Sequence, residues 1–337
     1  MTWFEELLGF REESPENVRR NVSIEGDTLV SYVNGARLNH GRLETPSLGE
    51  LRRRVEAIRK SNHSLTVREV VSDVQELHQD EANAGSLMQV ASQFNLLEMT
   101  SPHIRPEDGI TRYESDRTQG PACAIAAGAG TVYRNYFVPI NGELGQREEN
   151  QIDCLADMGK ALGNASENLW EMQNGYALAS KDGLKNIESQ IEARDEAGSN
   201  ELRGHLRVGV QWHTQVTLPG AHHHLAQVYC SALPVAYSNH EAIRWRSFAK
   251  LILEASYEAT MCLATLNAHE NHNRTVYLTM LGGGAFGNKR EWITDAITRS
   301  LAIFKDFDLD VGIVSYGHSN DDIQDLVARF RGMQEGD

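Results

Sequence analysis

The chain of 337 residues lacks an excess of basic residues. It contains 32 Lys and Arg against 47 Asp and Glu, which gives a formal net charge of −15. Such a chain repels polyanions, so we expect no nucleic-acid partner. No apolar run approaches the ~20 residues needed to cross a bilayer, and the N-terminal "MTWFEELLGF" has no basic segment typical of a secretory signal. We therefore expect a soluble cytoplasmic protein without a membrane partner, or one in a host cytosol if it is exported by another route.

Cysteine is also scarce. The four residues Cys123, Cys154, Cys230 and Cys262 form no C-x-x-C pair and lie in apolar or mixed surroundings, which favours reduced core thiols over disulfides. The run His222–His224 is a poor metal site because adjacent side chains on a strand point to opposite faces. We expect neither a metal site nor a cofactor.

Segments typical of strands and helices alternate along the chain. Strands are predicted at 65–74, 86–92, 206–218, 225–237, 274–281 and 309–317. Helices are predicted at 47–61, 120–137, 149–162, 240–271, 289–306 and 320–330, the one at 149–162 being either a helix or a loop with a short helix. This alternation predicts an α/β fold, a mixed sheet flanked by helices on both faces. We expect an N-terminal helical or irregular extension over 1–60 and one domain over 61–332.

The stretch "LTMLGGGAFGNKREWITDAI" (278–297) places four glycines between a predicted strand and a predicted helix. Consecutive N–H groups at the N-terminus of a helix form an anion site, and glycine lets a phosphate approach them closely. The stretch lacks the Lys-Ser/Thr of a P-loop and the G-x-G-x-x-G of a dinucleotide fold. It is therefore either a phosphate-binding loop or a tight turn without a ligand.

Two other loops follow or precede predicted elements. "SLMQVASQFNLLEM" (86–99) ends an apolar strand in Gln93-Phe94-Asn95, and a carboxamide there could bind ribose hydroxyls or a purine edge, or only its own backbone. The loop before the alanine-rich helix contains Glu107, Asp108, Glu114 and Asp116, interleaved with arginines. These carboxylates could activate water, or they could be solvated charges paired with the arginines.

The order of strand, glycine loop, helix and strand over 276–317 resembles the end of a macrodomain. In that family, a glycine loop of the S-T-G-V-F-G kind wraps the distal phosphates of ADP-ribose. The front half lacks the N-A-A-N and glycine triplet of ordinary macrodomains. Instead, "QVASQFNLLEM" and "RYESDRTQGPACAIAAGAGTVYRNYF" resemble the divergent branch that includes poly(ADP-ribose) glycohydrolases, and within it the MavL-like ADP-ribosyl hydrolases, which act on ADP-ribosylated arginine of ubiquitin.

The resemblance implies a hydrolase that cleaves ADP-ribose from a modified protein side chain. The implied ADP-ribose-binding residues are Gln93, Phe94, Asn95, Gly282, Gly283, Gly284, Ala285, Phe286, Gly287, Asn288 and Tyr316, with Asn95 on the ribose and Tyr316 against the adenine. The implied catalytic acids are Asp108 and Asp116, with Glu114 as the alternate. Its partner would be an ADP-ribosylated protein, with arginine of ubiquitin as the finer expectation. The alternatives are a reader module that binds ADP-ribose without chemistry and a hydrolase of a small ADP-ribose derivative.

Overall fold

The centre of the molecule is a seven-stranded mixed sheet. The computed structural model describes residues 1–60 and 63–335, and the strand order is β4-β11-β12-β6-β13-β14-β5. The strands are β4 (Arg42–Glu44), β5 (Thr66–Val71), β6 (Leu87–Ala91), β11 (Gly209–Gln215), β12 (His224–Cys230), β13 (Thr275–Leu278) and β14 (Asp310–Ser315). The five strands from β12 to β5 pair in parallel, whereas β11 pairs antiparallel with both neighbours.

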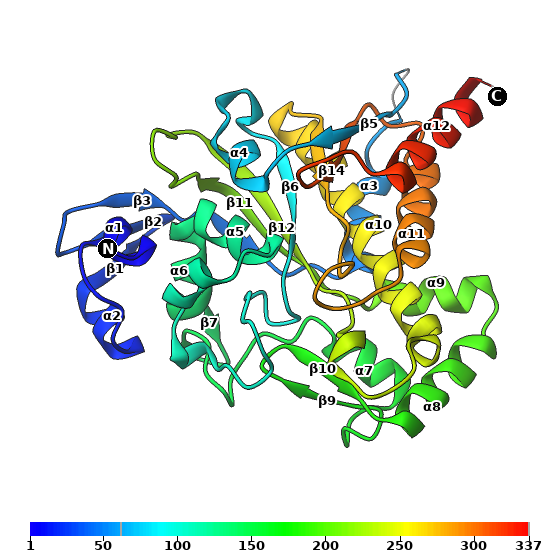
Figure 1. Ribbon diagram of the computed structural model, residues 1–337, viewed down its shortest axis with the longest axis horizontal. Helices are drawn as coiled ribbons and strands as arrows, with labels where there is room; N and C mark the ends of the chain where they lie inside the picture. Colours follow the sequence, from blue (N-terminus) through cyan, green and yellow to red (C-terminus); the bar gives the residue numbers. More distant parts are fainter. Residues whose placement is uncertain (61–62, 336–337) are drawn as a thin grey trace.

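Helices cover both faces of this sheet, as predicted (Figure 1). Gln227 on β12 donates to the carbonyl of Cys123 on one face, and Cys230 on the same strand contacts Thr260 on the other. The first face is covered by α4 (Val74–Gln79), α5 (Gln119–Ala126) and α6 (Gly128–Tyr136), and the second by α3 (Leu48–Glu56) and α10 (Arg246–Asn271), with α11 (Arg290–Ile303) packed on α10. The helix α12 (Asp321–Glu335) lies against α11 and β5.

The prediction of one alanine-rich helix at 120–137 is wrong in one respect, because the structure has two helices there, α5 and α6. Ala127 has φ −118° and ψ 56°, which is not helical. Two hydroxyls satisfy the backbone groups at the break, since Thr217 accepts from the N–H of Gly128 (2.9 Å) and Thr131 donates to the carbonyl of Ala124 (2.7 Å). The break turns the chain so that α5 begins beside the end of β6 and α6 packs along β11.

Residues 139–204 carry elements that the sequence pattern largely did not reveal. The segment predicted at 149–162 is a loop followed by α7 (Ala156–Leu162). The additional elements are β7 (Pro139–Ile140), β8 (Glu143–Leu144), β9 (Trp170–Gln173), β10 (Tyr176–Ala179), α8 (Lys181–Glu192) and α9 (Glu196–Gly204). Short 3₁₀ turns complete the chain: η1 (Glu81–Asn83), η2 (Pro106–Asp108), η3 (Thr111–Ser115), η4 (Val235–Tyr237) and η5 (Ala242–Trp245).

The N-terminal residues form a small layer at the left of Figure 1. It contains α1 (Trp3–Leu8), α2 (Pro15–Asn21) and the antiparallel strands β1 (Val22–Glu25), β2 (Thr28–Ser31) and β3 (Arg37–Asn39). Phe4 and Leu8 pack in one apolar cluster with Val132 and Tyr136 of α6. Within the same 60 residues, β4 joins the central sheet and α3 packs on α10.

Helix α3 shows how local sequence sets these boundaries. Ser47 and Glu50 form a capping box, in which each side chain accepts from the backbone N–H of the other residue (3.2 and 2.7 Å). The helix predicted at 47–61 is therefore present but ends at Glu56. Its predicted end at residue 61, and the predicted boundary there, lie outside the described residues. No helix in the described ranges is long and apolar enough to span a membrane.

Candidate active site

A cavity of ≈530 Å³ opens at the carboxyl ends of β5, β6, β13 and β14. Ligands of open α/β sheets bind at this edge, because loops from several parallel strands converge there. Its volume lies in the range of small-molecule sites, about 300–1,000 Å³. The loop after β13, the first turn of α5 and the segments that follow β6 and β14 all contribute to its wall.

The glycine loop, Leu281–Asn288, begins from a fixed point. The buried hydroxyl of Tyr257 on α10 donates to the carbonyl of Thr279 (2.6 Å) and accepts from the N–H of Leu281 (3.0 Å). Asn288 closes the loop, because its N–H donates to the carbonyl of Gly282 (2.9 Å) and its amide donates to the carbonyl of Leu233 (2.8 Å). The loop is therefore held at both ends by buried polar side chains.

The backbone conformation of this loop requires glycine at two positions, whereas a third glycine has open space around it. Gly282 and Gly287 have φ of +69° and +70°, and a Cβ on them would lie 2.4 Å from Ala232 Cβ and 2.8 Å from Ala236 Cβ, respectively. A Cβ on Gly284 would meet no atom within 4 Å. The backbone is thus tight where the loop turns and open where it faces the cavity.

The open part of the loop presents main-chain donors. Gly284, Ala285 and Phe286 line the cavity, and within the part of the chain that the structure describes their N–H groups have no hydrogen-bond partner. Gly284 and Ala285 are also exposed to solvent. Uncharged N–H groups grouped in this way suit an anion such as a phosphate.

The N-terminus of α5 forms the opposite wall. Thr118 to Ala122 line the cavity, and the first-turn N–H groups of a helix lack intrahelical partners. Gln119 ties this turn to β6, since its side chain accepts from the N–H of Ala91 (2.7 Å) and donates to the carbonyl of Gln89 (3.0 Å). A Cβ on Gly120 would lie 2.2 Å from the Ala91 carbonyl oxygen, so only glycine permits this approach.

Three carboxylates line the cavity: Asp73, Glu98 and Asp116. Asp116 is half-buried, and its Oδ1 accepts from the N–H of Thr118 (2.8 Å), which fixes it before the first turn of α5. Asp73 caps α4 by accepting from the N–H of Gln75 (2.7 Å). Asp116 is thus fixed at the start of α5, and Asp73 at the start of α4.

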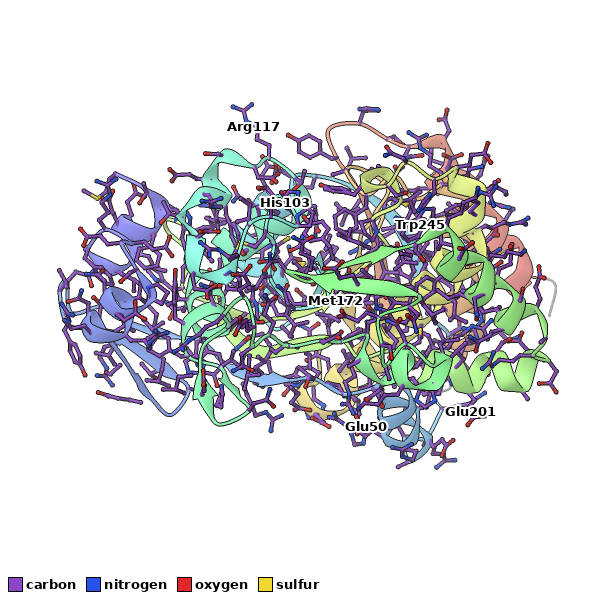
Figure 2. All side chains as sticks on the ribbon, turned by 90° about the horizontal axis from the view of Figure 1, so that it is seen from below. Glu50, His103, Arg117, Met172, Glu201 and Trp245 are labelled. Atoms are coloured by element: carbon purple, nitrogen blue, oxygen red, sulfur yellow. The ribbon has the colours of Figure 1, made fainter. Side chains whose placement is uncertain are left out.

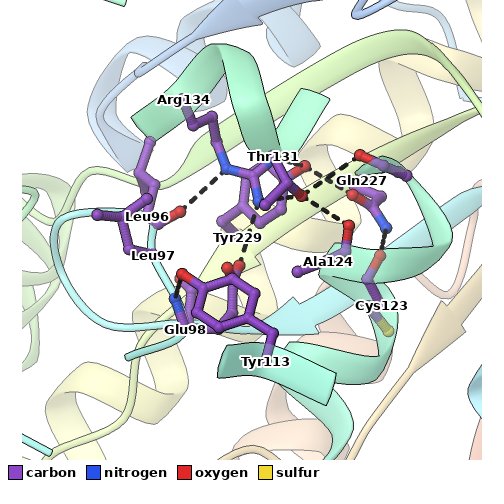
Figure 3. A network of polar contacts seen from close by, with 12 residues as sticks. Leu96, Leu97, Glu98, Tyr113, Cys123, Ala124, Thr131, Arg134, Gln227 and Tyr229 are labelled. Carbon is purple, nitrogen blue, oxygen red and sulfur yellow. Dashed lines mark hydrogen bonds and ion pairs between the residues drawn. The ribbon is translucent and has the colours of Figure 1, made fainter. Parts of the chain in front are cut away.

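Glu98 belongs to a buried polar network (Figure 3). Arg134, which is 0% exposed, donates to Glu98 Oε1 (3.3 Å), to the Leu96 carbonyl (3.0 Å) and to the hydroxyl of Tyr229. Burial raises the pKa of Glu98 to about 7, although Arg134 acts to lower it. The second oxygen, Oε2, has no hydrogen-bond partner among the described residues.

Aromatic side chains lie at two places on the cavity wall. Tyr176, Tyr237 and Phe286, from β10, η4 and the glycine loop, pack with ring centroids 5.3–5.5 Å apart. Tyr316 follows β14 and is 77% exposed. Arg117, beside the first turn of α5, also lines the cavity and extends toward solvent (Figure 2).

The cavity collects about half of the predicted site residues. Those that line it are Gln93, Gly282, Gly284, Ala285, Phe286, Asp116 and Tyr316. Gly283, Gly287 and Asn288 belong to the same loop and shape it without lining the cavity.

The other predicted binding residues lie behind the wall. Phe94 is buried in the core. Asn95 is 0% exposed, donates to the side chain of Gln151 (2.8 Å) and accepts from the N–H of Leu97 (3.1 Å). Its amide stabilises the turn after β6, which agrees with the alternative that the sequence left open, a carboxamide bonded to the nearby backbone.

Two of the three predicted acids are placed outside the cavity. Asp108 pairs with Arg105 (3.1 Å), and hydrogen bonds from that guanidinium lower the pKa of Asp108. Glu114 accepts from the N–H of Trp3 (3.2 Å) and so contacts the N-terminal layer. The structure brings only Asp116 of this group to the cavity.

Sequence reasoning missed several lining residues. Glu98 carries a signal, since it is the one charged residue in "QVASQFNLLEM". Asp73 and the aromatic pair Tyr176 and Tyr237 carry none, because they reach the cavity through the tertiary fold. No group of three or more His, Cys, Asp or Glu side chains is placed to hold a metal ion within the described ranges.

Comparisons with known proteins yield distant similarities only. No protein-family model matches the chain, and no curated protein matches it. Among solved structures, it is similar to poly(ADP-ribose) glycohydrolase from Deinococcus radiodurans in complex with ADP-ribose, with 11% identity, 97% of this chain and 99% of that chain covered, and a TM-score of 0.45. It is also similar to poly(ADP-ribose) glycohydrolase from Thermomonospora curvata (11% identity, 93% and 95% covered, TM-score 0.45) and to that enzyme bound to the inhibitor ADP-HPD (12%, 94% and 95%, 0.42). TM-scores below 0.5 do not establish a shared family.

Proposed function

We propose that the protein is an ADP-ribosyl hydrolase that binds ADP-ribose in this cavity and cleaves its bond to a protein side chain. The observation that carries the proposal is that free main-chain donors at Gly284–Phe286 and the carboxylate of Asp116 line one and the same cavity. Neutral donors suit a diphosphate bridge, and a carboxylate suits the cationic sugar that forms when a glycosidic bond breaks.

In this proposal, the adenine, the diphosphate and the distal ribose of ADP-ribose lie one after another along the carboxyl ends of the strands. The diphosphate lies between the glycine loop and the first turn of α5, where N–H groups approach from both sides. The adenine lies toward β14 and β5, where Tyr316 offers an exposed ring and Asp73 an acceptor. The distal ribose lies toward β6, near Gln93 and Asp116.

In the reaction, the bond between C1 of the distal ribose and the side-chain nitrogen breaks, and its electron pair leaves with the nitrogen. Positive charge develops at C1 and on the ring oxygen. Asp116 stabilises this charge and orients a water, whose oxygen adds to C1 and whose proton passes to the carboxylate. The proton then passes from Asp116 to the departing nitrogen, so the products are free ADP-ribose and the unmodified, protonated side chain, and the carboxylate is restored.

Arginine is the proposed linkage. Its guanidinium is cationic before cleavage, and the half-buried carboxylate of Asp116 favours a cation beside it. The net charge of −15 acts in the same direction at long range. Ubiquitin as the carrier protein is suggested only by the motifs that resemble MavL-like hydrolases.

The test is the release of free ADP-ribose from proteins carrying it on arginine, glutamate or serine, with modified ubiquitin as one substrate. We expect turnover of the arginine linkage, and Asp116→Asn to lower it by about 10²–10⁴-fold. The matched control is Glu148→Gln, which changes an exposed carboxylate whose ion pair among the described residues is with Arg105 (3.5 Å). Asp108→Asn in the same assay tests whether the acid predicted beside Asp116 acts despite lying outside the cavity.

Two outcomes would contradict the proposal. Tight binding of ADP-ribose without turnover of any linkage would indicate a reader module. Turnover of a small ADP-ribose ester, with none of any modified protein, would indicate a hydrolase of small derivatives.

A further inference from the structure

Glu98 occupies an unusual place for a carboxylate. It is 1% exposed, yet it lines the cavity. Its Oε1 accepts from Arg134 (3.3 Å), whereas Oε2 is buried and has no partner among the residues that the structure describes. A buried acid with half of its hydrogen-bonding capacity unused is costly, so its presence beside a proposed active site requires an explanation.

The backbone links Glu98 to the proposed catalytic acid. The N–H of Glu98 donates to the hydroxyl of Tyr113 (3.0 Å), and the N–H of Asp116 donates to the carbonyl of Tyr113 (3.1 Å). Tyr113 is 0% exposed, with its hydroxyl at the N–H of Glu98 and its backbone carbonyl at the N–H of Asp116. On the other side of Glu98, a Cβ on Gly120 would lie 3.2 Å from its Cγ, which places Glu98 directly against the start of α5.

Among the residues that the structure describes, the charge of Glu98 acts on four neighbouring titratable groups. The titratable and charged groups near it are Arg134 on α6, Tyr113 on η3, Tyr229 on β12 and Cys123 on α5. Burial raises the pKa of both tyrosines and of the cysteine, so all three are neutral at ordinary pH. Arg134 is therefore the one cation in this set, and ionised Glu98 is its counter-ion.

We infer that Glu98 is a positioning residue for Asp116, and that the reaction requires Glu98 in its ionised form. This inference rests on the proposed function. When ionised, Glu98 makes a charge-assisted hydrogen bond with Arg134, which fixes the turn after β6, Tyr113 and the backbone that carries Asp116. When protonated, it leaves Arg134 without a counter-ion, and the hydrogen bond between the two side chains loses its charge assistance.

The experiment compares the pH dependence of ADP-ribose release by the full chain with that of Glu98→Gln, which keeps the shape of the side chain and cannot ionise. We expect kcat of the unaltered protein to rise through about pH 7, following the ionisation of Glu98. Glu98→Gln should stay near the low-pH level throughout, about 10- to 100-fold below the unaltered protein at high pH. The Kd for ADP-ribose should change little, since the variant leaves the glycine loop intact.

The control Glu148→Gln should keep the rise in kcat. If thermal melting shows that Glu98→Gln does not fold, Tyr113→Phe is measured instead. That variant removes the hydroxyl that accepts from Glu98, so kcat should fall while the rise through pH 7 remains. A Glu98→Gln variant whose activity is lowered equally at every pH would show a purely structural role and overturn the inference, and so would a Tyr113→Phe variant whose kcat is unchanged.

The outcomes separate this inference from the proposed function. An unaltered protein that neither binds nor hydrolyses ADP-ribose conjugates would overturn the proposed function, and the role of Glu98 with it. Hydrolysis by the unaltered protein, together with an unchanged pH profile in Glu98→Gln, would overturn the role of Glu98 alone.

Discussion

The substitution Gly284→Val tests whether the glycine loop binds the diphosphate. A Cβ at this position meets no atom within 4 Å, and its φ lies outside the left-handed region. Valine should therefore change the free energy of unfolding by no more than about 0.5 kcal/mol, as for other surface substitutions. The added methyl groups instead occupy the space through which a phosphate would approach the loop.

The effect on binding follows from the donors that are lost. A hydrogen bond to a charged group contributes about 1.5–3 kcal/mol. Losing one such bond between the diphosphate and the N–H of Gly284 or Ala285 should raise the Kd by about 10- to 150-fold. Isothermal titration calorimetry with ADP-ribose measures this change, and thermal melting checks that the fold is retained.

Two further glycine substitutions make the comparison specific. Gly332→Ala adds a methyl group in open space on α12 and should leave the Kd unchanged. Gly282→Ala should lower the melting temperature, because its Cβ would lie 2.4 Å from Ala232 Cβ at a φ of +69°. A Gly284→Val variant that binds ADP-ribose as tightly as the unaltered protein would refute the assignment of the loop.

Three other predictions concern the carboxylates. Asp116→Asn should lower kcat by about 10²–10⁴-fold in the release assay while calorimetry finds the Kd little changed, and equal losses in both would mean that this acid acts in binding. The raised pKa of Glu98 means that the folded state binds its proton more tightly than the unfolded state, whose pKa is 4.5. This contribution to the free energy of unfolding is therefore complete below pH 4.5 and is lost as the pH rises to about 7. At about 1.4 kcal/mol per pH unit, the loss is about 3 kcal/mol. Urea unfolding should show this loss in the unaltered protein, and the Glu98→Gln variant should not show it. Glu12→Ala should destabilise the protein by about 1–3 kcal/mol, because Glu12 accepts from the N–H groups of Ile110 (3.0 Å) and Thr111 (2.7 Å) and from Tyr136; an unchanged denaturation midpoint would contradict this.

Local patterns predicted the elements that carry strong periodicity. The 26 residues of α10 and the parallel strands β13 and β14 lie within their predicted ranges because their apolar residues repeat at the spacing of a helix or fill a buried strand. The break at Ala127 was missed, because it depends on a hydroxyl from Thr217 that lies 89 residues from Gly128. The hairpin of β9 and β10 is too short for its periodicity to stand out.

In the site, too, local sequence predicted some features, whereas others depend on the tertiary fold. The glycine loop was predicted from its composition, and the structure places Gly284 and Phe286 at the cavity. A local run of acidic residues predicts a negatively charged loop, but it does not predict which side chains reach the cavity. Asp116 lines the cavity, whereas Asp108 pairs with Arg105. The role inferred for Glu98 depends on Arg134, which lies 36 residues away in the sequence and meets it only in the folded chain.

The most direct test of the account is a crystal structure of the protein with ADP-ribose. We predict that the diphosphate oxygens lie within hydrogen-bonding distance of the N–H groups of Gly284, Ala285 or Phe286, with C1 of the distal ribose on the side of Asp116. Nucleotide density elsewhere on the surface, or a diphosphate held by side-chain cations while the loop makes no contact with it, would contradict the account.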